Sequence, residues 1–235
     1  MRILLLADIH SNWPALVAID ETFDACLFLG DVVDYATDPV PCIEWLQRHA
    51  TFWVRGNHDH SVAQRVTVTP GGTFRRMAAA MRPHHFDVLT DEHLTWLAQM
   101  PVTQQITLGD HSFLLVHATP RDPLDEYVAN IKDQWAVRLA HVTVDFVCVG
   151  HTHIPMDLEL ENTRVINPGS VGQPRDGDAR AAYAIIDNGV VEFRRVEYDI
   201  EQIVQHMADA GIQDEIVTKA GSVLRAGGNP TSPGL

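Results

Sequence analysis

The sequence predicts a layered α/β domain in which strands and helices alternate along the chain. Short apolar runs rich in β-branched residues recur through the chain, and stretches with the hydrophobic spacing of a helix separate them. The length of 235 residues is that of one large domain. With 46% hydrophobic and 20% charged residues, the composition is that of an ordinary packed protein.

The first 60 residues alternate strand and helix. They predict, in order, a buried strand at 3–7, a helix at 12–23, a strand at 25–29, a helix beginning at Asp38-Pro39 and a strand at 51–54. Asn12 and Asp38 are residue types that cap helices, and proline is well tolerated in the first helical turn. Residues 61–101 then lack strands, and helical stretches at 74–81 and 91–100 predict a small helical insert.

The second half returns to strands. It predicts strands at 103–108, 112–116, 146–149, 156–160, 164–166, 182–186 and 190–196, and helices at 125–140, 200–210 and 212–224. The turn at 187–189, Asp-Asn-Gly, joins the last two strands as a tight hairpin. We therefore expect one domain over residues 1–226, followed by a flexible Gly/Pro/Ser-rich tail at 227–235.

Charge and cysteine usage restrict the partners of the protein. A formal net charge of −14 repels a phosphate backbone, so extended nucleic acid is not an expected partner. The apolar run at 3–7 is too short for a signal peptide, and no run approaches the roughly 18 apolar residues of a membrane span. The three cysteines lie in apolar contexts and are expected to be buried free thiols. These features predict a cytoplasmic protein without a membrane partner, and they leave its oligomeric state open.

Side chains that bind metal ions follow five predicted strands, at the point where each strand ends. The clusters are Asp8-Ile9-His10, Gly30-Asp31-Val32-Val33-Asp34, Gly56-Asn57-His58-Asp59, His117 and Gly150-His151-Thr152-His153. Because strand carboxyl ends in an open sheet converge on one crevice, we expect these side chains to meet there. A capped turn or a hydrogen-bonded histidine explains any one cluster, but not five in succession.

The ligand types indicate transition metals. Carboxylates, imidazoles and one amide oxygen, without a thiolate, suit Mn²⁺, Fe, Co²⁺ or Zn²⁺ better than Mg²⁺ or Ca²⁺. Seven or more ligands at one place exceed the need of one ion. We therefore expect two divalent ions, with Mn²⁺ as the first choice and Fe, Zn²⁺, Co²⁺ or Ni²⁺ as alternatives.

In order and spacing, these motifs resemble those of the calcineurin-like metallophosphoesterase superfamily over about residues 1–196. The resemblance implies a four-layer αββα sandwich of two mixed β-sheets flanked by helices. It implies that one ion is held by Asp8, His10, Asp31 and His153. It implies that the other is held by Asp31, Asn57, His117 and His151, so that Asp31 bridges the two.

The resemblance also implies two catalytic residues, with His58 beside the leaving group and Asp34 orienting it. The chemistry agrees with this assignment. Two cations roughly 3.5–4 Å apart polarise phosphoryl oxygens and activate a hydroxide for attack on phosphorus. A protonated imidazole stabilises or protonates the departing oxygen, and a neighbouring carboxylate holds its tautomer. The sequence thus predicts a metal-dependent phosphoric ester hydrolase acting on a small phosphorylated substrate.

Local features favour one branch of the superfamily. Tyr35 stands where serine/threonine phosphoprotein phosphatases carry an arginine, which disfavours that branch. Asp8 to Asn12 and the loop at 167–178 look like the small bacterial phosphodiesterases, some of which cleave dinucleoside polyphosphates. Phosphomonoester or phosphoprotein hydrolysis is the alternative. A non-catalytic scaffold, like the retromer subunit of this superfamily, is disfavoured because His58 is intact.

The predicted insert contains a reversal of charge. Residues 60–86 contain no acidic residue and carry four arginines, Arg65, Arg75, Arg76 and Arg82. Guanidinium groups match phosphate geometry, so Arg75 and Arg76 are candidate substrate contacts, and Arg175 in the loop at 167–178 is a third. A solvated helix face or a subunit contact explains the insert arginines equally well, and a loop salt bridge explains Arg175.

Overall fold

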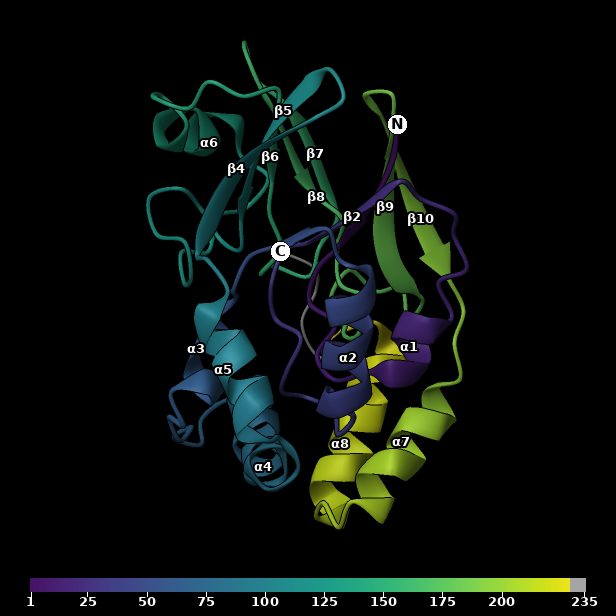
Figure 1. Cartoon of the computed structure of the whole chain (residues 1–235). Helices are drawn as coiled ribbons and strands as arrows, with labels where there is room; N and C mark the ends of the chain where they lie inside the picture. The colour runs from purple at the N-terminus through teal and green to yellow at the C-terminus, as the bar shows by residue number, and fades with distance from the viewer. Residues whose placement is uncertain (229–235) are drawn as a thin grey trace.

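The protein, described here by a computed structural model over residues 1–228, contains two five-stranded mixed β-sheets with helices outside them (Figure 1). Sheet A contains, in spatial order, β10 (Val190–Val196), β9 (Ala181–Asp187), β1 (Arg2–Leu6), β2 (Ala25–Phe28) and β3 (Phe52–Trp53). β1, β2 and β3 are parallel, whereas β9 is antiparallel to both β1 and β10. The carboxyl ends of the three parallel strands therefore lie at one edge.

Sheet B is formed by the middle of the chain. Its spatial order is β4 (Thr103–Leu108), β5 (His111–Val116), β6 (Phe146–Cys148), β8 (Arg164–Asn167) and β7 (Met156–Glu159). β5, β6 and β8 are parallel, and the two outer strands are antiparallel to their neighbours. The predicted sandwich of two mixed sheets is thus confirmed.

Side-chain alternation along the strands builds the layers. Ile3 and Leu5 of β1 point to one side, where they join Phe113 and Leu115 of β5 in a buried cluster between the sheets. Leu4 and Leu6 point to the other side and join the cluster that the helices cover. The outer face of sheet B packs on Trp135, which is 1% exposed. Helices therefore cover the outer face of each sheet.

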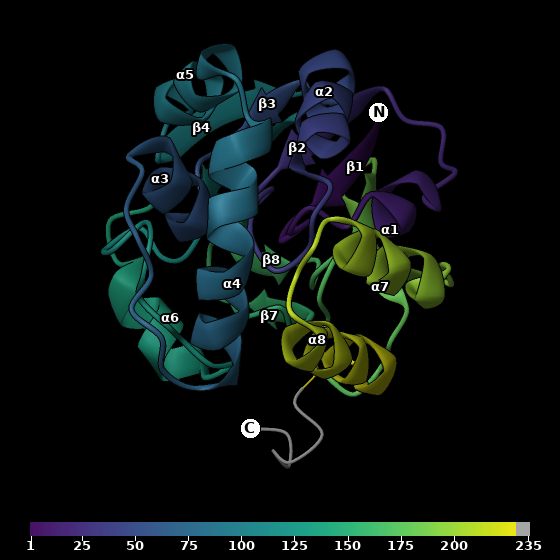
Figure 2. The same ribbon diagram turned by 90° about the horizontal axis from the view of Figure 1, so that it is seen from below.

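The helices are α1 (Trp13–Val17), α2 (Pro39–His49), α3 (Asn57–Ala63), α4 (Thr73–Val88), α5 (Asp91–Gln99), α6 (Lys132–Arg138), α7 (Ile200–Asp209) and α8 (Asp214–Ala226). α3, α4 and α5 follow one another between β3 and β4. Seen from below, α4 lies between α3 on one side and α8 on the other (Figure 2). Met77 and Met81 of α4 share a buried cluster with Val217 and Val223 of α8.

Two predicted helices are shorter than expected. The helix at 12–23 ends at Val17, although Asn12 caps it as predicted by accepting from Ala15 N. Beyond it, Asp24 and Glu21 bind Arg2 at the start of β1. The helix predicted at 125–140 is only α6, because residues before it contact other parts of the molecule. Tyr127, for example, donates its hydroxyl to the carbonyl of Thr152. Tertiary hydrogen bonds outweigh the helical pattern in both segments.

One helix is longer than predicted, and another was not predicted. α4 continues through Pro83 to Val88, beyond the predicted end at residue 81. Proline lacks an N–H donor, and burial of Met81 and His85 around it offsets the lost bond. α3 was not predicted, and it begins at Asn57 with Gly56 as its N-cap. Asp38 precedes α2 as predicted, but its side chain makes no cap and instead binds His206.

Three further expectations concern the cysteines, the membrane and the tail. Cys26, Cys42 and Cys148 are buried free thiols. No helix within residues 1–228 has the length and hydropathy that a bilayer crossing requires. Residues 229–235 of the tail predicted at 227–235 lie outside the described residues. Gly227 still belongs to the fold, since it ends α8 in the left-handed conformation.

Candidate metal centre and catalytic cleft

The five motif clusters lie at strand ends of both sheets, not of one. Asp8 and His10 follow β1, Asp31 follows β2, and Asn57 follows β3, all in sheet A. His117 follows β5 and the pair His151 and His153 follows β6, both in sheet B. The parallel strands of the two sheets therefore direct their carboxyl ends into a shared crevice. The sequence predicted the convergence and did not show that two sheets contribute.

The backbone at these strand ends is strained. Asp8, His10, Asp31, His151 and His153 all adopt left-handed φ values, between 49° and 67°. Each non-glycine residue in this region costs on the order of 1–3 kcal/mol. Such outliers cluster where the surrounding fold enforces a functional geometry. Here the sharp turns after the strands aim the ligand side chains inward.

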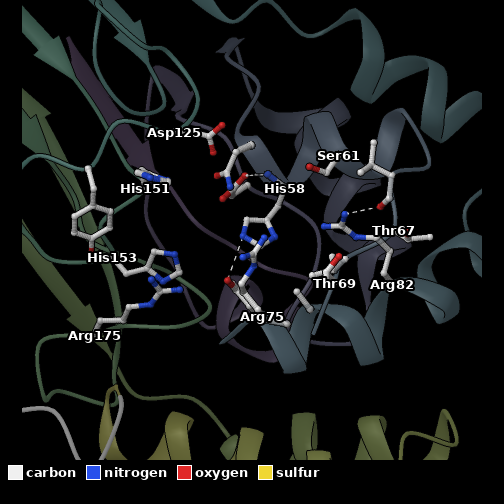
Figure 3. Close-up of a pocket in the computed structure, with 17 residues that line it drawn as sticks. His58, Ser61, Thr67, Thr69, Arg75, Arg82, Asp125, His151, His153 and Arg175 are labelled. Carbon is white, nitrogen blue, oxygen red and sulfur yellow. Dashed lines mark hydrogen bonds between the residues drawn. The ribbon is translucent and has the colours of Figure 1, made fainter. Parts of the chain in front are cut away.

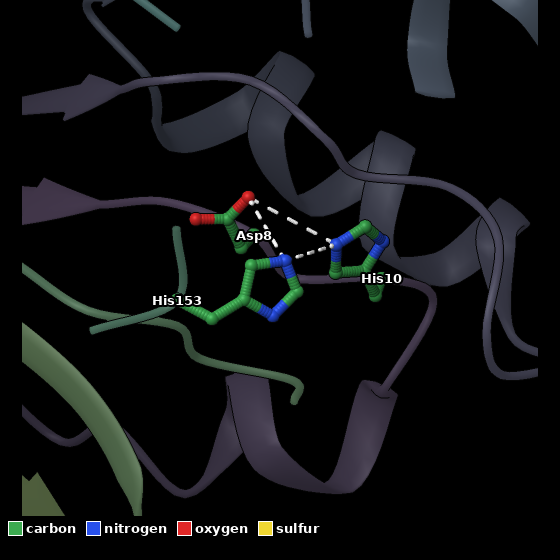
Figure 4. A group of neighbouring side chains, drawn as sticks. All are labelled: Asp8, His10 and His153. Carbon is green, nitrogen blue, oxygen red and sulfur yellow. Dashed lines mark hydrogen bonds and ion pairs between the residues drawn. The ribbon is translucent and has the colours of Figure 1, made fainter. Parts of the chain in front are cut away.

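The first ligand group consists of Asp8, His10 and His153 (Figure 4). The two imidazole Nε2 atoms lie 3.1 Å apart. Asp8 Oδ1 lies 3.9 Å from the Nε2 of His10 and 3.5 Å from that of His153. All three side chains are buried, so their ligand atoms are shielded from solvent.

Hydrogen bonds on the far side of each ring define the tautomers. His10 donates from Nδ1 to the carbonyl of Val33 at 2.7 Å, and His153 donates from Nδ1 to that of Gln173 at 2.6 Å. A neutral ring with Nδ1 protonated has a bare lone pair at Nε2. Burial lowers the pKa of His10 to about 3 and that of His153 well below its ordinary value, so both rings are neutral.

The first group fits a cation. Two Nε2 lone pairs face each other, and neither has a proton to share. Both carboxylate oxygens of Asp8 are buried without a hydrogen-bond partner, and burial raises the pKa of Asp8 to about 8. An unpaired buried carboxylate is costly, and a bound divalent ion satisfies it together with the two lone pairs.

The second ligand group consists of Asp31, His117 and His151. The Nε2 atom of His117 lies 3.2 Å from Asp31 Oδ2 and 3.2 Å from Asn57 Oδ1. Its Nδ1 atom donates to the carbonyl of Leu29 at 2.8 Å. Burial opposes a charge on His117, but the Asp31 carboxylate outweighs burial and raises the pKa of His117 to about 10. The same attraction lowers the pKa of Asp31 against the effect of burial.

Asp31 stands between the two groups. Its Oδ2 atom is 3.8 Å from Nε2 of His10 in the first group and 3.2 Å from Nε2 of His117 in the second. The structure therefore brings together every residue predicted as a ligand, and Asp31 lies beside a histidine of each group. The mixture of imidazole, carboxylate and amide donors is one that suits transition metals.

Asp59 supports the second group and was not predicted. Its buried carboxylate accepts hydrogen bonds from the backbone N–H groups of Asp31 at 2.7 Å, Val32 at 2.8 Å and Gly56 at 3.0 Å. It thereby joins the end of β2 to the start of α3. A Cβ atom on Gly56 would lie 2.0 Å from Asp31 Oδ1, so only glycine fits there. The acidic residue three positions after Gly56 was the available sequence signal.

The loop after β8 supports the first group. Ser170 donates its hydroxyl to the carbonyl of Asp8 at 2.7 Å, and Asn167 donates to that of Gly150 at 2.6 Å. Gly172 lies so close to Ile9 that an added Cβ would be 1.8 Å from its carbonyl oxygen. This loop was noted in the sequence for its resemblance, and its part in positioning the ligands follows only from the structure.

His58 and Asp34 form a hydrogen-bonded pair beside the ligand groups. The Nδ1 atom of His58 is 2.6 Å from Asp34 Oδ2, and its backbone N–H donates to Asp31 Oδ1 at 2.9 Å. Its Nε2 atom faces the hydroxyl of Tyr35 at 3.2 Å. Burial alone would lower the pKa of His58, but the carboxylates of Asp31 and Asp34 outweigh it and raise that pKa. Asp34 is also bound by Arg82.

A cleft of about 450 Å³ opens onto the second ligand group. Figure 3 shows His151 and His153 on one side of it and Thr67 and Thr69 on the other, with His58 between them. The predicted contacts Arg75 and Arg175 both line the cleft. Arg76 is exposed and is not among the lining residues, because adjacent helical side chains point about 100° apart. Arg175 lies over the ring of Phe74, 4.0 Å from its centroid.

The chain is similar to one protein-family model and to several known proteins. The model of the calcineurin-like phosphoesterase superfamily domain matches residues 1–189. A metallophosphoesterase structure from Sphaerobacter thermophilus is 34% identical, with a TM-score of 0.79, and covers 97% of this chain and 99% of that one. An uncharacterized protein of Methanocaldococcus jannaschii is 29% identical over 228 residues, which is 85% of this chain and 89% of that protein. The Escherichia coli phosphodiesterase YfcE is 25% identical over 206 residues, covering 81% and 90%.

Proposed function

The chain belongs to the calcineurin-like phosphoesterase superfamily and is a metal-dependent phosphoester hydrolase, and we propose that it cleaves phosphodiester or polyphosphate anhydride bonds of small nucleotide-like molecules at two metal ions. One observation carries the dinuclear proposal. Two groups of metal-type ligands lie side by side, with Asp31 of the second group 3.8 Å from His10 of the first, and Asp31 and His58 line the same cleft.

The residues that would hold the ions are those of the two ligand groups, with Asn57 added to the second. Bound divalent cations polarise phosphoryl oxygens and lower the pKa of the attacking water. The protein itself supplies His58, which lines the cleft; its Nδ1 proton is held by Asp34, and its Nε2 atom lies 3.2 Å from the hydroxyl of Tyr35. In this proposal Nε2 carries the proton that the departing oxygen receives.

A substitution at His58 tests this assignment. We expect His58→Ala to keep its metal and to lose about 10²–10⁴-fold in kcat on substrates with poor leaving groups. Metal content by elemental analysis and turnover with added Mn²⁺ are measured on the same sample. Wild-type kcat on a poor leaving group would contradict the assignment.

A parallel screen of phosphodiesters, dinucleoside polyphosphates and monoesters tests the substrate class, and turnover of monoesters alone would overturn it.

The cleft arginines support an extended anionic substrate. Arg75 comes from α4 and Arg175 from the loop after β8, and both reach the same cleft. In a protein of net charge −14, two guanidinium groups at the cleft locally offset the repulsion of a polyanion. We therefore assign them to phosphates beyond the one that is cleaved.

The assignment is tested by comparing two substrates. Arg75→Gln and Arg175→Gln should each lower kcat/KM for a dinucleoside tetraphosphate about ten- to a hundredfold, the value of one charge-assisted contact. A singly charged aryl phosphodiester should be affected far less. Arg76→Gln removes the same charge one residue away and serves as the matched control. Equal, small losses on both substrates would mean that the arginines do not contact the additional phosphates.

A further inference from the structure

Arg82 is a buried charge within the helix that covers the cleft. It lies on α4 and is 4% exposed. Its Nε atom donates to Asp34 Oδ1 at 3.2 Å, and one terminal nitrogen binds Asp34 Oδ2. The other terminal nitrogen donates to the carbonyl of Val66 at 2.8 Å. The guanidinium therefore holds both oxygens of one carboxylate and, at the same time, the chain segment that forms a wall of the cleft (Figure 3).

This pair is joined to His58. Asp34 Oδ2, which Arg82 binds, also accepts from Nδ1 of His58 at 2.6 Å. Nε2 of His58 in turn lies 3.2 Å from the hydroxyl of Tyr35. The result is a continuous chain of polar contacts from α4 to the proposed proton donor. Asp34 is fully buried, so rotation of its carboxylate is limited by these partners.

Stability of the fold does not explain the arrangement. Burying an arginine and a carboxylate costs desolvation energy, and well-packed apolar residues of similar volume are often equally or more stabilising. A bidentate guanidinium–carboxylate pair does, however, restrict orientation more strongly than a single hydrogen bond. The physical consequence of the pair is therefore that it fixes the orientation of Asp34, and with it the orientation of the His58 ring bonded to Asp34.

We propose that Arg82 is a positioning residue, which orients Asp34 and through it the His58 ring toward the leaving group. This inference rests on the proposed function, because it takes His58 to be the proton donor. It assigns to the arginine-rich segment a role that is distinct from phosphate binding. Arg75 is exposed at the cleft, whereas Arg82, which also lines the cleft, is buried and bound to Asp34.

The role predicts a dependence on the leaving group. A misdirected His58 slows cleavage when the departing oxygen needs a proton, and it matters little when the oxygen leaves easily. For Arg82→Gln we expect kcat to fall about 10–100-fold on a phenyl phosphodiester and less than about threefold on its 4-nitrophenyl counterpart. KM should stay within about twofold of wild type on both, because the Arg82 guanidinium is buried and its donors are taken by Asp34 and Val66. Arg82→Lys, which keeps the charge without the fork, should give an intermediate loss with the same selectivity.

The matched control is Arg2→Gln. Arg2 also binds a carboxylate, that of Glu21, and a backbone carbonyl, that of Thr22, but at the amino end of β1 away from Asp8. Its substitution should leave the ratio of the two kcat values unchanged. Metal content and the thermal unfolding midpoint are measured for every variant, so that misfolding is recognised.

Three outcomes separate the alternatives. A selective loss on the phenyl ester in both Arg82 variants supports the proposal. Equal losses on both esters, or a rise in KM without a change in kcat, would overturn it and leave Arg82 as a structural anchor. If His58→Ala itself turns over the phenyl ester like wild type, the proposed function fails, and it fails independently of any result at position 82.

Discussion

At the scale of single residues, the site depends on which nitrogen of each histidine carries the proton. His10, His117 and His153 all direct Nδ1 at a backbone carbonyl, so each presents Nε2 to the centre. Backbone carbonyls cannot rotate away as side chains do. The fold therefore sets the direction of these three rings before any ion arrives, which reduces the ordering cost of binding, although His117, with its raised pKa, must also release a proton.

The place of Asp31 beside both ligand groups leads to a prediction about metal content. If Asp31 bridges two ions, Asp31→Asn removes a charge that both need, and an amide is a weaker ligand than a carboxylate. We expect the purified variant to contain less than the wild-type amount of metal at both sites, and elemental analysis measures this directly. Asp145→Asn, which changes an exposed aspartate near the β5–β6 edge, serves as the control. Two fully occupied ions in Asp31→Asn would show that Asp31 does not bridge.

At the scale of elements, the loop after β8 and the end of β1 hold each other in place. Val171 and Gly172 donate backbone N–H groups to the carbonyls of Ala7 and Asp8. Gly172 is the point of closest approach, since any Cβ there meets the carbonyl of Ile9. The two ligands on the β1 end are therefore sensitive to a residue that contacts no ligand side chain itself.

Gly172→Ala tests this coupling. The added methyl group must displace the segment of Asp8 and His10, and overpacking of this kind costs about 1–3 kcal/mol of unfolding free energy. Metal affinity should fall more at the first ligand group than at the second. Denaturant unfolding and metal titration measure the two effects. Gly72→Ala is the matched control, because a Cβ there meets nothing within 4 Å. Equal stability of the two variants would argue against the coupling.

At the scale of the whole molecule, metal ions would join the two sheets. Asp8, His10, Asp31 and Asn57 come from sheet A, whereas His117, His151 and His153 come from sheet B. Ions bound between them stabilise the folded state over the unfolded chain by mass action. They also compensate Asp8, whose buried carboxylate oxygens otherwise have no partner.

We therefore expect a chelator to lower the thermal unfolding midpoint. One site at a free metal concentration 100 times its Kd contributes about 2.7 kcal/mol, which corresponds to a shift of about 5–11 °C for a domain of this size. Scanning calorimetry with and without Mn²⁺ measures the shift. The Asp31→Asn variant should show a much smaller one. An equal shift in that variant would place the stabilising ion elsewhere.

The sequence by itself determined which residues meet at the site. Each cluster of candidate ligands directly follows an apolar strand. The end of a strand can be predicted from the residues of that segment alone, without knowledge of its partners in the fold. For this reason β1, β2, β3, β5 and β6 form where they were expected, and six of the seven residues predicted as ligands fall in two groups that could hold a metal ion. The helices α5, α7 and α8 were predicted close to their observed bounds for the same reason, because the spacing of their apolar residues agrees with which of them are buried.

Only the tertiary structure decided what depends on partners distant in the chain. Residues 18–23 and 125–131 have helical patterns, yet contacts with Arg2 and Thr152 draw them out of a helix. α4 passes through Pro83 because its buried face compensates the lost hydrogen bond. In the sequence Arg82 cannot be told apart from the other three arginines of the insert, and it is buried because Asp34, 48 positions earlier, lies beside it. Local pattern specifies a residue's conformation and chemistry, whereas its partner is chosen by how the layers pack.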